Sequence, residues 1–276
     1  MSRDVQVRVL SGAQNGVLLL TAERLTDFSS NKERLFLLDK PLFELNYIHL
    51  LKQNCKISDM NCKLIIFDFD GTLGDTRRNI VTTMQMTIAE LRLDERSEAA
   101  CAATIGLPLT GCFQTMFPDL AQDMIQRCAD TYRRIFAENL QTLRPKAFPH
   151  VVETLKALKT QGFALTIASS RSHASLTELT HDLHIADYIS YLIGADDVEQ
   201  AKPHPEPVLK TLAALGMKAD EALVVGDMAV DILMGANAGT KTCGVTWGNG
   251  TRQELEEAGA DFIIDSMQEL LSAWPI

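Results

Sequence analysis

The sequence predicts an α/β fold, a doubly wound parallel sheet that is interrupted after its first strand by an all-helical insert. Three observations lead to this prediction. Short apolar runs alternate with amphipathic stretches from residue 146 onward, a rhythm typical of parallel sheets covered by helices. The stretch 76–145 carries only helical patterns. An apolar run at 64–67 ends abruptly in two aspartates.

The bulk composition excludes several classes of protein. The chain has 276 residues, enough for one large domain or two modest ones, with 46% hydrophobic and 22% charged residues. Its net charge of −10 argues against nucleic acid as a partner, because phosphate backbones need a cationic surface. It contains no apolar run long enough for a bilayer and no secretory signal. The six scattered cysteines are therefore expected to be reduced thiols, and the cytoplasm is the expected location.

Residues 1–59 differ from the rest of the chain. They carry short apolar patches but no sustained period of either kind, and Met60 stands just before the first strand of the main domain. We interpret 1–59 as an N-terminal extension, arising from a misplaced start, that takes no part in chemistry. The open alternative is a small accessory segment packed on the main domain.

The first predicted strand leads directly into the candidate chemistry. Residues 64–67 form a short apolar run typical of a buried parallel strand, and Asp68 and Asp70 follow it. Strand alternation predicts that both carboxylates point the same way while Phe69 enters the core. Two such acids repel each other unless a cation lies between them. Hard oxygen ligands suit Mg²⁺, which completes its shell with waters and phosphate. The alternative to a metal site is an ordinary surface turn, since Asp-Gly turns often follow strands.

The remaining elements follow in order. From Asp75 or Thr76, as helix cap, the pattern is helical to Leu91. Further helices are predicted within the insert at 97–105, 109–116 and 120–140. Helices are then predicted at 151–160, 172–183, 205–215, 228–238, 253–258 and 267–273, and strands at 163–168, 188–193, 222–225, 242–245 and 262–264. This predicts a core domain from 60–75 and 146–276, and a helical domain over 76–145.

Polar residues also stand at three later strand ends or loops of this sheet. Ser169, Ser170 and Arg171 end one strand just before a helix, an arrangement suited to anions or to plain helix capping. Lys202 lies in a proline-rich segment that fixes its direction, so its ammonium could neutralise phosphoryl charge. Asp227 ends another strand, and Asp231 follows on the first turn of the next helix.

Taken together, these four groups resemble the signatures of the haloacid-dehalogenase superfamily. The signatures appear here as Asp68-Phe-Asp70-Gly-Thr, Ser169, Lys202 and Gly226-Asp227 with Asp231. The resemblance covers residues 63 to about 273. It implies a Rossmann-like sheet with a helical cap of the first cap class, inserted after the first motif.

The resemblance also implies roles for the site residues. Asp68 would attack phosphorus and form an aspartyl-phosphate. Asp70 would protonate the leaving oxygen and then activate water. Residues implied to bind the substrate are Gly71, Thr72, Ser169, Ser170 and Arg171. Mg²⁺ would be held by Asp68, Asp227 and the Asp70 backbone carbonyl, with Asp231 orienting Lys202 or a metal-bound water.

Several longer segments resemble the bacterial phosphoglycolate phosphatases within that superfamily. Two of them are Lys202-Pro-His-Pro-Glu-Pro and Gly244-Val-Thr-Trp-Gly. The expected activity is therefore hydrolysis of a small phosphorylated metabolite. Pyrophosphate hydrolysis stays open, since the same site would accept that substrate. A β-phosphoglucomutase-like transferase is disfavoured because Ile80 stands where that enzyme has a cap histidine. The alternative to an enzyme is a binding module that has the same fold but no catalytic activity. The cap residues Arg77 and Arg78 are candidate substrate contacts, and no motif predicts an oligomeric state.

Overall fold

The computed structural model describes residues 6–10, 19–23 and 61–273. Strands β1 (Gln6–Leu10) and β2 (Leu19–Glu23) form an antiparallel pair, which the sequence pattern did not predict. The other residues of the predicted extension 1–59 lie outside the described ranges. No helix among the described residues is long and apolar enough to cross a bilayer.

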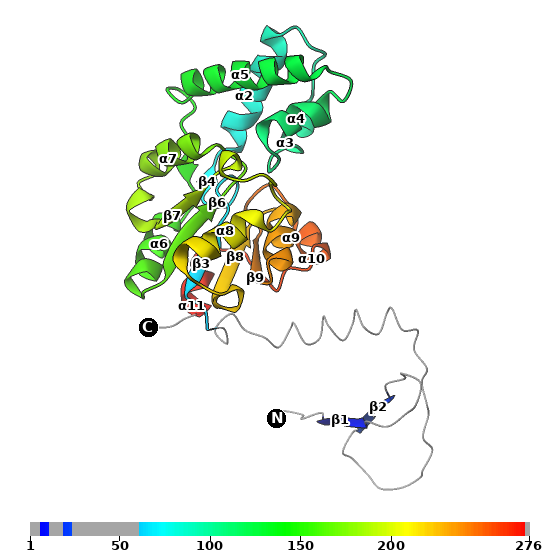
Figure 1. Cartoon of the computed structure of the whole chain (residues 1–276), viewed down its shortest axis with the longest axis vertical. Coiled ribbons are helices and arrows are strands. Elements are labelled where there is room, and N and C mark those ends of the chain that lie inside the picture. Colours follow the sequence, from blue (N-terminus) through cyan, green and yellow to red (C-terminus); the bar gives the residue numbers. More distant parts are fainter. Residues whose placement is uncertain (1–5, 11–18, 24–60, 274–276) are drawn as a thin grey trace. The chain divides into compact units, whose positions relative to one another are not determined.

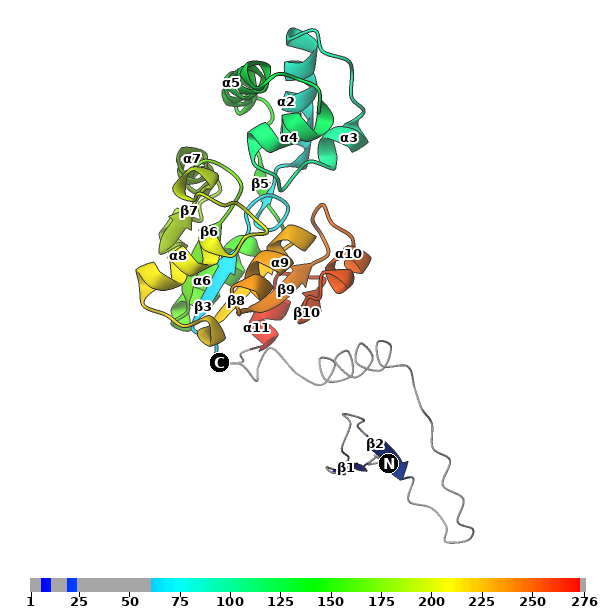
Figure 2. The same cartoon turned by 45° about the vertical axis from the view of Figure 1, so that its right-hand side comes forward.

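A six-stranded parallel sheet forms the centre of the fold (Figures 1 and 2). Its strands are β3 (Leu64–Phe67), β6 (Ala164–Ala168), β7 (Tyr191–Ile193), β8 (Ala222–Gly226), β9 (Lys241–Val245) and β10 (Phe262–Ile264). They lie in the order β10-β9-β8-β3-β6-β7, and every neighbouring pair is parallel. The predicted fold class is confirmed. The direction of strand addition reverses between β3 and β8, and ligands of such sheets bind at this switch point.

Helices cover both faces of the sheet. They are α6 (Val151–Thr160), α7 (His173–Asp182), α8 (Glu206–Leu215), α9 (Ala229–Asn237), α10 (Arg252–Glu257) and α11 (Glu269–Ala273). Strand β3 is buried on both sides: Ile65 and Phe67 belong to the core beneath α6, α7 and α11, and Leu64 and Ile66 to the core beneath α8 and α9. This two-sided burial explains why the strand is a continuous apolar run.

Residues between β3 and α6 form the helical insert. Its helices are α2 (Arg77–Glu90), α3 (Glu98–Ala102), α4 (Leu109–Met116) and α5 (Gln122–Asn139). They group together apart from the sheet in both views (Figures 1 and 2). Helix α5 buries one face because Ile125, Cys128 and Tyr132 recur at helical spacing. The Tyr132 ring lies edge-on to Phe113 of α4, with ring centroids 6.3 Å apart.

A short antiparallel pair joins the insert to the sheet. Strand β4 (Gly74–Asp75) pairs with β5 (Lys146–Ala147) at the two points where the chain enters and leaves the insert. The Phe148 N–H also donates to the Leu73 carbonyl, at 3.0 Å. The sequence pattern did not predict this pair, because two residues per strand carry no detectable period.

Other differences concern the ends of elements. The strand predicted at 188–193 begins only at Tyr191, because a short 3₁₀ helix, η2 (Ala186–Tyr188), precedes it. Helix α3 is shorter than the predicted 97–105, and its N-cap is Ser97, whose hydroxyl accepts from the Ala100 N–H. Two further 3₁₀ turns, η3 (Ala195–Asp197) and η4 (Ala219–Glu221), lead into and out of the segment that holds α8.

Candidate active site

The loop after β3 carries two aspartates, Asp68 and Asp70, whose carboxylates have different hydrogen-bond partners. The Asp68 N–H still donates to the Val225 carbonyl of β8, at 2.8 Å, so Asp68 keeps its place in the sheet. The chain then turns, because the Phe69 carbonyl accepts from the N–H groups of Leu73 and Gly74 at 3.0 and 2.9 Å. The regular strand therefore ends just before this turn. Phe69 is fully buried, as predicted.

Gly71 allows this turn to approach β8 closely. Its φ of +91° lies in the left-handed region, which side chains rarely adopt. A Cβ at this position would lie 2.2 Å from Oδ2 of Asp227. A glycine is thus required for the first loop and the end of β8 to share one site.

Lys202 lies between two of the carboxylates. Its Nζ donates to Oδ1 of Asp68 and to Oδ1 of Asp231, both at 2.6 Å. All three side chains are buried. Burial acts to lower the pKa of Lys202, but attraction to Asp231 and Asp68 outweighs it and raises that pKa above its ordinary value. Lys202 is therefore a fixed positive charge beside Asp68.

Asp227 is held by residues from two loops. Its Oδ1 accepts from the Thr72 hydroxyl at 3.0 Å, and its Oδ2 accepts from the Asn249 N–H at 2.7 Å and from Asn249 Nδ2 at 3.1 Å. Asn249 was not among the predicted site residues. The only feature of the sequence that could have indicated Asn249 is its position. The segment Trp247-Gly-Asn-Gly follows β9, at the same end of the sheet as Asp68 and Asp227. The Trp247 indole N–H also donates to the Thr72 carbonyl, at 3.1 Å.

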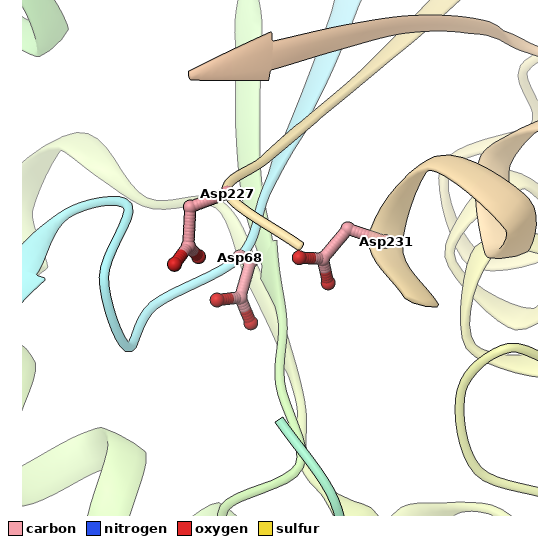
Figure 3. Close-up of side chains that lie close together, drawn as sticks. All are labelled: Asp68, Asp227 and Asp231. Atoms are coloured by element: carbon pink, nitrogen blue, oxygen red, sulfur yellow. The ribbon is translucent and has the colours of Figure 1, made fainter. Parts of the chain in front are cut away.

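Asp68, Asp227 and Asp231 converge. Each offers one carboxylate oxygen, and these oxygens lie within 4.8 Å of one another. Figure 3 shows the three side chains, which come from the ends of β3 and β8 and from the first turn of α9. Buried carboxylate oxygens at this spacing are the hard ligands that Mg²⁺ prefers, so the residues fit this cation. The Asp70 carboxylate is not part of this group; the contribution predicted for Asp70 is its backbone carbonyl.

The crowding of these acids perturbs their protonation. Burial raises the pKa of Asp227 to about 7, and the nearby Asp231 adds to the rise. Burial also raises the pKa of Asp68 well above its usual range, and Lys202 opposes this rise. One lysine cannot balance three buried carboxylates, so the cluster has excess negative charge when it is fully ionised.

The carboxylate of Asp70 has different partners. Both of its oxygens accept from Nε of Arg171, at 2.8 and 2.7 Å, and Oδ1 also accepts from the Thr76 hydroxyl at 2.6 Å. Thr76 is the N-cap residue of α2, one of the two predicted caps, but its side chain makes no capping hydrogen bond. The hydroxyl is bonded to Asp70 instead.

The serines after β6 are also separated. Ser169 is buried, and its hydroxyl accepts from the Arg171 N–H at 3.3 Å. The Ser170 hydroxyl donates to the Gly106 carbonyl of the insert, at 2.6 Å. Ser172, and neither of these two, is the N-cap of α7 and accepts from the Ser175 N–H. Ser169 therefore has no capping role; it directly follows β6, the strand that pairs with β3.

Protonation of Asp227 predicts a pH-dependent effect of Mg²⁺ on stability. In the unfolded chain an aspartate titrates near about pH 4, whereas the folded pKa is raised to about 7. The folded state thus binds more protons between these values, and the free energy of unfolding of the metal-free protein falls as pH rises through them. A Mg²⁺ ion at these carboxylates would favour their ionised form, so added Mg²⁺ is expected to raise Tm more at pH 8 than at pH 5.

Thermal unfolding with EDTA or with Mg²⁺ at both pH values measures this difference. The Asp227→Asn variant is the comparison, and the pH-dependent difference should be smaller in it, with Asp68 as the remaining acid of raised pKa. An equal Tm increase at pH 5 and pH 8 in the native chain would contradict the prediction.

The fold and the site define a class of protein, a doubly wound α/β domain with a buried acidic cluster at the switch point of its parallel sheet. The family model described as haloacid dehalogenase-like hydrolase matches residues 65–245. This chain belongs to that family.

Curated relatives cover most of the chain. A probable phosphatase, IndB, from Dickeya dadantii is 36% identical over 76% of this chain and 92% of its own length. Pyrophosphatase PpaX from Anoxybacillus flavithermus is 35% identical over 77% of this chain and 97% of its own length. Phosphoglycolate phosphatase from Aquifex aeolicus is 33% identical over 67% of this chain and 85% of its own length. The solved structure of a predicted phosphoglycolate phosphatase from Haemophilus somnus has a TM-score of 0.72 and 25% identity, over 77% of this chain and 98% of its own. The chain is thus a phosphatase-type hydrolase of this family.

Proposed function

We propose that this protein is a magnesium-dependent phosphatase that hydrolyses a small phosphomonoester, of the kind represented by phosphoglycolate, through an aspartyl-phosphate on Asp68. The observation that carries this proposal is the convergence of Asp68, Asp227 and Asp231 beside the buried ammonium of Lys202. Mg²⁺ would be held by Asp68 and Asp227, with the Asp70 backbone carbonyl and Asp231 as the other proposed contributors. It would supply positive charge that offsets the negative charge of the phosphoryl group.

In the first step, an Asp68 oxygen forms a bond to phosphorus while the bond to the leaving oxygen breaks. Asp70 gives its proton to the leaving oxygen. In the second step, Asp70 takes a proton from water and the water oxygen forms a bond to phosphorus. The bond between phosphorus and the Asp68 oxygen breaks, which releases phosphate and restores the carboxylate of Asp68. Lys202 lies 2.6 Å from Asp68, where its charge lowers the cost of bringing an anion to a carboxylate.

Other residues around Asp68 are proposed to hold the substrate. The Ser169 hydroxyl, the Ser170 backbone and the loop of Gly71 and Thr72 would bind phosphoryl oxygens. The insert over 76–145 is proposed to act as a cap domain above the core domain of 60–75 and 146–276. The five described cysteines are free thiols, which supports the proposed cytoplasmic location, since reduced cysteines are usual there.

Pyrophosphate is the second candidate substrate, because the relative PpaX is named a pyrophosphatase. A transferase of the β-phosphoglucomutase kind is not favoured, since Ile80 is buried and offers no proton-transfer group at the expected cap position. A silent binding module is not favoured either, since every residue required for the proposed chemistry is present.

A substrate screen tests the proposal. We expect the native protein to release phosphate from p-nitrophenyl phosphate with Mg²⁺ and to lose this activity in EDTA. Specificity constants for 2-phosphoglycolate, pyrophosphate, sugar phosphates and nucleotides then rank the candidates, with 2-phosphoglycolate expected first. Absence of Mg²⁺-dependent turnover on all of them would favour the silent module, and a leading rank for pyrophosphate would favour the second candidate.

A further inference from the structure

Arg171 lies where the core and the helical insert meet. It follows β6, and its side chain is only 10% exposed. The guanidinium carbon lies 4.9 Å from the ring centroid of Phe136 in α5 and 5.9 Å from that of Phe69 in the first loop. Aromatic faces attract a cation most strongly when it is removed from water. Arg171 thus connects the loop that carries Asp70 to a helix of the insert.

The hydrogen bonds of Arg171 use only part of its guanidinium. Nε donates to both oxygens of Asp70, and Nη1 donates to the Ser175 hydroxyl at 3.3 Å. Nη2 is buried and has no acceptor among the described residues. An arginine that pairs fully with a carboxylate normally uses two nitrogens in parallel. Here Asp70 occupies one nitrogen, and two N–H donors of Nη2 remain without a partner, which is costly in a buried site.

This ion pair also restrains Asp70. Its carboxylate accepts from Arg171 and Thr76 and from no group of the acidic cluster. The proposed acid must reach the leaving oxygen of a phosphoryl group attached to Asp68. It must therefore give up at least part of its pairing with Arg171 during turnover. A second anion that binds Arg171 would compete with Asp70 and favour this release.

We propose that Arg171 determines specificity by binding a negatively charged group on the leaving portion of the substrate, and that this binding frees Asp70 to act as the acid. The inference deepens the proposed function and rests on it. The substrate class is then a phosphoryl compound whose leaving group carries a carboxylate, as in 2-phosphoglycolate, or is itself a phosphate, as in pyrophosphate. Nη2 is shielded from solvent, so the anion reaches it only when the packing around the guanidinium, including Phe136, opens. Recognition of the anion is thereby coupled to the insert.

The test compares two substrates of matched size, 2-phosphoglycolate and 2-hydroxyethyl phosphate, which differ in a carboxylate or a hydroxyl on the leaving alcohol. The native protein should prefer 2-phosphoglycolate by about 10- to 100-fold in kcat/KM, the range of a charge-assisted hydrogen bond. In Arg171→Gln this ratio should fall to near one. Arg171→Lys should give an intermediate ratio, because an ammonium keeps the positive charge but lacks the planar guanidinium that can donate two parallel hydrogen bonds. Pyrophosphate, assayed beside them, distinguishes a second phosphate from a carboxylate as the preferred anion.

Arg127→Gln is the matched control. Arg127 is an exposed residue of α5, so its replacement removes the same charge from the insert and should leave the ratio unchanged. If Arg171→Gln does not fold, the ratios of the native protein and of Arg171→Lys decide the question. A native ratio near one, or an equal loss on both substrates in the Arg171 variants, would overturn the inference and leave the proposed phosphatase intact. Failure of the native protein to hydrolyse either ester or pyrophosphate would overturn both.

Discussion

Replacing Asp68 with Asn is expected to lower turnover by about 10⁴-fold or more, the scale of losing a catalytic nucleophile. The amide is nearly the same size as the carboxylate but cannot form the acyl phosphate. Lys202 keeps its ion pair with Asp231, so the fold should survive. The measurement is the steady-state rate with Mg²⁺ on the best substrate of the screen, together with circular dichroism and Tm.

Asp220→Asn is the control for Asp68→Asn. Asp220 is an exposed acid in η4, and its replacement should leave the rate at the native value. A native rate in Asp68→Asn would remove the nucleophile from the proposed mechanism. A lost rate accompanied by an unfolded spectrum would point to a structural role for Asp68 instead.

Replacing Asp70 with Asn should lower turnover by about 10²- to 10⁴-fold, the usual contribution of a general acid–base group. With p-nitrophenyl phosphate the leaving group needs little help from an acid, so the first step should continue while hydrolysis of the intermediate slows. A burst of p-nitrophenol followed by a slow phase is expected. The Asn side-chain oxygen can still accept from Arg171, so Tm should fall only modestly.

Mass spectrometry after acid quench would identify a phosphoryl group on Asp68 in the Asp70→Asn protein. The double variant with Asn at both positions is the control and should carry none. Finding no trapped phosphoryl group in Asp70→Asn, together with a native steady-state rate, would contradict the proposed acid–base role of Asp70.

The parts of this fold that sequence predicts best are those governed by periodic burial. Strand β3 could be predicted because all four of its residues are buried, which requires an unbroken apolar run. Asp68 and Asp227 could be placed together because parallel strands end at one edge of a sheet. The partly buried α5 could be predicted from its apolar stripe in the same way.

Features set by single turns could not be predicted. The turn between Asp68 and Asp75 depends on one carbonyl, that of Phe69, which accepts several N–H groups. Nothing in the pattern of residues 68–74 indicates that carbonyl's partners. The bonds from Asn249 to Asp227 depend on a loop after β9 whose path has no period. Such contacts are specified by tertiary geometry and leave no local signal.

The pairing of β4 with β5 means that the chain departs for the insert and returns from it side by side, with Gly74 opposite Ala147 and Asp75 opposite Lys146. The two chain crossings between the sheet and the insert are therefore adjacent. They also make the whole intervening segment replaceable as a unit, because a graft spliced between these same residues leaves the spacing of the six strands undisturbed. Evolution can therefore change the substrate specificity of such a protein through the insert while the residues at the strand ends stay the same.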